Sequence, residues 1–88
     1  MTESNEDVLA ELDEEVRRDP PRLFAIYGVY DERLSEDEYP GYVEWGLEFP
    51  DEEWAIACGP GSTHISGSAE QMLKSNTLMG EARLVWFP

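Results

Sequence analysis

The chain has 88 residues, a net charge of −14 and 41% hydrophobic residues. This length suffices for one domain over residues 1–88 and not for two, and the share of apolar residues excludes a disordered acidic tail. The negative charge opposes direct binding to nucleic acid or to an anionic membrane and favours a basic protein partner. Cys58 is the single cysteine, which excludes an internal disulfide, and its apolar neighbours predict a buried thiol.

The acidic residues are unevenly distributed. Residues 1–19 carry eight acids and two arginines, residues 31–53 carry ten acids and one arginine, and residues 54–88 are neutral. We expect the acids of the middle segment to share one surface, because a hairpin there would place its strand face beside both flanking loops. These acids are Glu36, Asp37, Glu38, Glu44, Glu48, Asp51, Glu52 and Glu53.

The first predicted element is a helix over residues 7–18, preceded by a frayed segment over residues 1–6. Its apolar residues recur at helical spacing and form one stripe. The stripe consists of Val8, Leu9, Leu12 and Val16. Asp19-Pro20-Pro21 ends the helix, because proline disfavours helical backbone in the residue before it. We expect this stripe to pack against a sheet.

Three strands are predicted next, over residues 23–30, 42–49 and 54–58. The first is apolar on both faces, which indicates a place near the centre of the sheet. The second alternates, so one face should be buried and the other should be wet and acidic. The expected buried side is Val43, Trp45, Leu47 and Phe49, and the wet side is Tyr42, Glu44, Gly46 and Glu48. The short acidic segment 50–53 predicts a hairpin.

The rest of the chain reads as a glycine-rich loop over 59–67, a helix that Ser68 opens, and a last strand over 82–87 inside the sheet. The pattern predicts an α+β fold in the order α-β-β-β-α-β, with a four-stranded antiparallel or mixed sheet and two helices packed on one face. The predicted core is Leu12, Phe24, Ile26, Trp45, Leu47, Ile56, Leu73, Leu84 and Trp86.

No catalytic or metal motif is present in the sequence. His64 is the single histidine, and the serines near it do not by themselves form a nucleophile–base pair. The acidic runs lack the alternating ligand spacing of a calcium loop. We therefore expect no enzyme activity, no cofactor and no metal ion.

The sequence favours a small acidic, non-enzymatic interaction protein that binds a basic protein partner. A bacterial immunity protein, an antitoxin or a nucleic-acid mimic would fit this pattern, since acidic fields accelerate association and aromatic residues anchor interfaces. The expected partner-binding residues are Glu36, Asp37, Glu38, Tyr39, Tyr42, Glu44 and Glu48.

Two non-enzymatic alternatives stay open, and a pocket lined by His64 and a buried carboxylate would make an enzyme a third. The first is a ligand- or anion-binding module that uses the glycine-rich loop 59–68, with His64 and Ser68 as its contacts. The second is an accessory structural subunit, whose charge serves solubility alone. The sequence also leaves a homodimer open. The acidic start of the chain and the lack of a long apolar run predict a cytoplasmic location.

Overall fold

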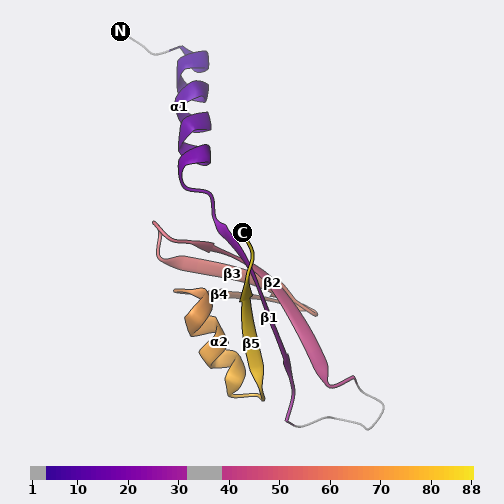
Figure 1. Ribbon diagram of the computed structural model, residues 1–88. Coiled ribbons are helices and arrows are strands. Elements are labelled where there is room, and N and C mark those ends of the chain that lie inside the picture. The colour runs from indigo at the N-terminus through magenta and orange to yellow at the C-terminus, as the bar shows by residue number, and fades with distance from the viewer. Residues whose placement is uncertain (1–3, 32–38) are drawn as a thin grey trace.

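A computed structural model describes residues 4–31 and 39–88 of the chain. It has two helices and a five-stranded sheet, which places the chain in the α+β class (Figure 1). The elements are α1 (Asn5–Arg18), β1 (Arg22–Val29), β2 (Gly41–Phe49), β3 (Trp54–Gly59), β4 (Ser62–Ser66), α2 (Ala69–Thr77) and β5 (Ala82–Trp86).

The strands follow the order β4-β3-β2-β1-β5, and every neighbouring pair is antiparallel. The prediction of four strands was wrong, because Ser62–Ser66 pairs with β3 as an additional edge strand. Gly61 makes this hairpin turn tight, since its φ of +74° belongs to a backbone region that glycine enters without strain. The last strand, β5, lies at the opposite edge beside β1 and not inside the sheet.

Helix α2 covers one face of the sheet. Phe24 and Ile26 are fully buried beneath it, as predicted, together with Met72 from the helix. Gly46 lies opposite Phe24 in the β1–β2 pairing, and a Cβ at this position would be 2.7 Å from Cε1 of Phe24. The phenylalanine ring therefore occupies the space that a side chain on β2 would need, and it lies against Trp86 with 5.6 Å between ring centroids.

The two faces of β2 are the reverse of the prediction. Tyr42, Glu44, Gly46 and Glu48 point toward α2, whereas Val43, Trp45 and Leu47 are exposed on the other side. The reason is the size of the residues next to the helix. Glycine and alanine on β2 and β3 leave room for the Phe24 ring and for α2, and larger side chains alternate to the opposite face. These small residues are Gly46, Ala55, Ala57 and Gly59.

Helix α1 packs on neither face of the sheet, so the prediction of two helices on one face was wrong. None of its residues is buried, and the molecule extends over 67 × 21 × 21 Å because α1 projects from one end (Figure 1). Pro20 and Pro21 follow the helix and have fixed φ angles, which oppose a sharp reversal toward the sheet. The helix begins at Asn5, because Ser4 Oγ accepts a 3.2 Å hydrogen bond from the Asp7 N–H. Residues 1–3 of the segment predicted to be frayed lie outside the described residues.

The predicted core is therefore confirmed only on the α2 side. Leu12, Trp45 and Leu47 are exposed, and the prediction was wrong for these three. Four further members are only partly buried: Ile56, Leu73, Leu84 and Trp86. Over residues 4–31 and 39–88, no helix is long and apolar enough to cross a membrane.

Candidate interaction surface

Two of the acids that were expected to meet a partner face helix α2 instead. Glu44 is only 6% exposed, and its Oε1 accepts a 3.0 Å hydrogen bond from Nδ2 of the buried Asn76. Glu48 Oε1 accepts a 3.0 Å hydrogen bond from the backbone N–H of Ala69, the first residue of α2. These carboxylates hold the helix on the sheet, so the shared acidic surface predicted for residues 36–53 does not include Glu44 or Glu48.

The two tyrosines of the predicted site differ in burial but line the same cavity. Tyr39 is 81% exposed, whereas Tyr42 is buried with its ring 4.9 Å from that of Tyr30. Burial raises the pKa of the Tyr42 hydroxyl; the Glu44 carboxylate adds to this rise and the Asn76 amide opposes it. Both tyrosines contribute to a cavity of about 620 Å³ at the ends of β1 and β2. Glu36, Asp37 and Glu38 lie outside the described residues.

Both residues of the alternative ligand site lie next to other groups of the fold. His64 Nδ1 lies 3.2 Å from Oε2 of Glu44, on the α2 side of β4. Ser68 is the N-cap of α2, and its Oγ accepts a 3.1 Å hydrogen bond from the Gln71 N–H. Ser68 thus opens the helix, as predicted. His64 therefore lies on the part of the sheet that α2 covers, and Ser68 caps the start of α2.

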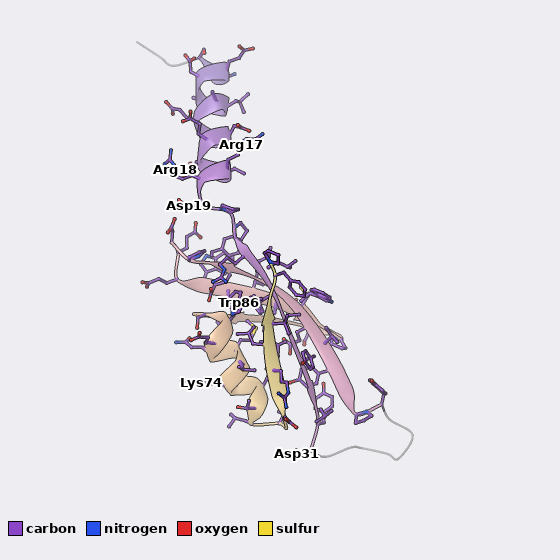
Figure 2. The ribbon with its side chains drawn as sticks, in the orientation of Figure 1. Arg17, Arg18, Asp19, Asp31, Lys74 and Trp86 are labelled. Atoms are coloured by element: carbon purple, nitrogen blue, oxygen red, sulfur yellow. The ribbon has the colours of Figure 1, made fainter. Side chains whose placement is uncertain are left out.

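Acidic residues gather instead around α1 and the β2–β3 turn. Helix α1 carries six acids, and Figure 2 shows its side chains, including Arg17 and Arg18, directed into solvent. Arg17 Nε forms a 2.9 Å ion pair with Asp13 within the helix. At the turn, the carboxyl of Asp19 lies beside that of Asp51 and raises the pKa of Asp51 through a hydrogen-bonding contact and through its negative charge.

An apolar groove joins α1 to this turn. A cavity of about 320 Å³ is lined by Leu12 and Val16 of the helix and by Phe49 and Pro50 of the turn. Acidic side chains border the same groove: Glu15, Asp19, Asp51 and Glu52. The sequence predicts the stripe and the acids separately, and it predicts that the stripe packs against the sheet. We use the name acidic end for these three features together: the stripe of α1, the groove and the acids that border the groove.

No protein family, curated protein or solved structure matches this chain. Within the part of the chain that the structure describes, no group of three or more His, Cys, Asp or Glu residues is arranged to hold a metal ion. The acidic end is the place where exposed apolar side chains and exposed charge occur together. This combination is typical of protein–protein recognition, where apolar anchors supply affinity and surrounding charges select the partner.

Proposed function

We propose that this protein is a non-enzymatic interaction protein that docks its acidic end on a basic protein partner. The observation that carries the proposal is helix α1, which is amphipathic but leaves its whole apolar stripe exposed. An amphipathic helix of this kind binds by laying its apolar face into a groove of the partner. The acids beside the stripe select a groove with a basic rim.

The arrangement of side chains around α1 supports this mode of binding. At 100° per residue, Glu11 and Glu15 lie on one side of the stripe and Asp13 lies on the other. An apolar groove with arginines or lysines on both rims would therefore meet complementary charge on both sides. Leu12 and Val16 are the anchors, because they also line the groove next to Phe49.

The basic charge expected of the partner suggests what binding would do to that partner. Proteins that bind nucleic acid carry basic surfaces, and an acidic helix that covers such a surface would compete with the nucleic acid for it. Inhibition of a basic protein, as by an immunity protein or an antitoxin, is the role we propose. The ligand-binding alternative has weaker support, since Ser68 Oγ already caps α2 and His64 Nδ1 lies 3.2 Å from the buried Glu44 carboxylate within the fold.

The test compares proteins captured from the native host by matched variants of the full chain. Leu12→Ser with Val16→Ser removes the anchors, and Ala10→Ser is the control on the opposite side of the helix. Because α1 buries none of its residues, both changes should leave the melting temperature of the sheet domain unchanged. A true partner is retained by the wild type and by Ala10→Ser, is lost with the double variant and binds more weakly as salt increases.

Charge reversal gives the second measurement. Glu11→Lys with Glu15→Lys should slow association with the captured partner by about tenfold, while dissociation changes less, since peripheral charges act mainly on encounter. Retention that is indifferent to the stripe, to charge reversal and to salt would overturn the proposal. The accessory-subunit alternative, with charge serving solubility alone, would then replace it.

A further inference from the structure

The sheet face opposite α2, here called the open face, is apolar and exposed. Its exposed residues include Leu23, Tyr27, Val43, Trp45, Leu47 and Ile65. Strand pairing aligns aliphatic side chains in one row across four strands, in which Ile65 lies opposite Ile56, Ile56 opposite Leu47 and Leu47 opposite Leu23. In a monomer this face would leave its hydrophobic side chains in water, whereas a sheet normally buries such a face against another layer.

The open face also lacks the negative charge that covers the rest of the chain. Among the strand residues that point to it, Arg83 alone is charged, and its Nη2 forms a 2.7 Å ion pair with Glu81 Oε1. A neutral face within a chain of net charge −14 does not attract a basic partner. It matches a surface that is equally apolar and equally free of net charge.

The α2 side alone provides a thin core. The buried core cluster on this side of the described chain has seven residues, and three of them are alanines: Ala55, Ala57 and Ala69. Alanine removes little apolar area from water, and hydrophobic stabilisation scales with that area. A domain this small is marginal even with a full core, so burial of the open face would add substantially to its stability.

We propose that the open face binds the open face of a second copy, so that two sheets form a sandwich with α2 of each copy outside. The five strands contain five to nine residues each, so the flat face measures roughly 400–700 Å² at standard strand spacing and rise. The side chains make the surface uneven, so its accessible area is larger than this flat estimate. The result is close to the roughly 800 Å² that each partner contributes to a standard stable interface.

The face carries a projection and a hollow that suit two-fold symmetry. Trp45 is 53% exposed near the centre of the face, and its ring lies tilted by 31° against that of Phe87, with 5.5 Å between ring centroids. The hollow is the cavity of about 620 Å³, to which Tyr27 and Val43 contribute from this side of the sheet. In a symmetric pair, the indole of each copy inserts toward the hollow of the other, so each contact occurs twice.

Helix α1 is the competing occupant, because its stripe is also apolar and exposed. However, its own linker contains Pro20 and Pro21, which oppose folding back over the same sheet. The acids that flank the stripe, Glu11, Asp13 and Glu15, would also be brought to the sheet without basic residues to meet them, since Arg83 is already paired. A second open face introduces no such charge, and we therefore assign the open face to the second sheet.

The experiment measures the mass of the full chain by light scattering and sedimentation over a range of concentrations. The wild type should have twice the chain mass of 10.0 kDa at micromolar concentration, and its melting temperature should rise with concentration. Trp45→Glu and Val43→Glu should weaken dimerisation at least 100-fold, because each places two unpaired carboxylates in the interface. Leu78→Glu, a matched change of an 86% exposed residue after α2, should leave the dimer intact.

Cys58 provides a readout that does not depend on any substitution. It lies opposite Trp45 in the β2–β3 pairing and is exposed in the single chain, contrary to the buried thiol that the sequence predicted. Its labelling by a thiol reagent should slow as protein concentration rises. A concentration-independent monomer with a freely reactive Cys58 would overturn the proposal. Loss of the dimer in Leu12→Ser/Val16→Ser would also overturn it, and would assign the open face to α1 of the other copy. These outcomes are independent of whether a basic partner binds the acidic end.

Discussion

Glu48 on β2 accepts a 3.0 Å hydrogen bond from the backbone N–H of Ala69, the first residue of α2. The first N–H groups of a helix have no acceptor within the helix, and the helix dipole places partial positive charge there. Ser68 Oγ accepts from one such group, the N–H of Gln71, and the Glu48 carboxylate accepts from another. The sheet thus provides a negative charge where α2 begins, and this contact helps determine which face of the sheet the helix covers.

Removal of the Glu48 carboxylate should therefore destabilise the domain. Glu48→Ala should lower the free energy of unfolding by about 1 kcal/mol, in the range measured for the loss of a helix N-cap. Glu53→Ala is the matched control, because it also removes one negative charge but from an exposed residue of the β2–β3 turn. The control should change stability by less than about 0.5 kcal/mol. Equal losses in urea titrations of the two variants would show that the hydrogen bond contributes nothing.

The contact between Phe24 and Gly46 leads to a prediction about overpacking. A Cβ at position 46 would lie 2.7 Å from Cε1 of Phe24, whose side chain is fully buried. The ring cannot move freely, so Gly46→Ala should cost about 1–3 kcal/mol, as overpacked core substitutions do. The measurement is chemical denaturation followed by tryptophan fluorescence.

A double-mutant cycle separates this contact from other effects of alanine on the strand. Phe24→Leu destabilises the core by itself but removes the ring that the new methyl group would meet. In the Phe24→Leu background, Gly46→Ala should therefore cost less than about 0.5 kcal/mol, with the difference appearing as coupling between the two sites. The same cost in both backgrounds would contradict the packing explanation.

Local patterns in the sequence predicted most elements but not the orientation of β2. The Pro20–Pro21 helix stop, the β2–β3 hairpin and the start of α2 at Ser68 are all local signals, and the structure contains each of them. The alternation along β2 shows which residues share a face, but it does not show which face receives the helix. That choice depends on Phe24, which is remote in the sequence, and on the small residues of β3, and both meet β2 only in the folded sheet.

The candidate site was also only partly predictable. Net charge and aromatic content favoured an interaction protein, and this function stays a proposal. Glu44 and Glu48 were assigned to the partner because exposed carboxylates are the rule, and buried ones occur only with partners. Those partners are Asn76 and the Ala69 N–H, each more than 20 residues away along the chain. For α1, amphipathic spacing normally indicates packing within the same chain, so the sequence had no signal that its stripe would stay exposed.

The last prediction concerns the neighbouring carboxyls of Asp19 and Asp51, at the base of α1. The Asp19 carboxyl raises the pKa of Asp51 above its usual value of 3.8. A raised pKa in the folded state means that the folded chain holds this proton more tightly than the unfolded chain does. This tighter binding of the proton therefore stabilises the folded arrangement at pH values below the folded-state pKa of Asp51. The stabilisation is lost as pH rises through that pKa.

Side-chain carboxyl resonances followed by NMR from pH 7 to pH 2 test this pair directly. The midpoint of Asp51 should lie above that of an isolated aspartate, and Asp19→Asn should move it back toward the ordinary value, since an amide cannot share the proton in the same way. The amide resonances of Leu12 and Val16 should shift with the same midpoint, because both residues line the groove beside Asp51. If Asp51 titrates identically with and without the Asp19 carboxyl, α1 and the turn do not interact through these groups, and the two parts of the acidic end would bind a partner independently.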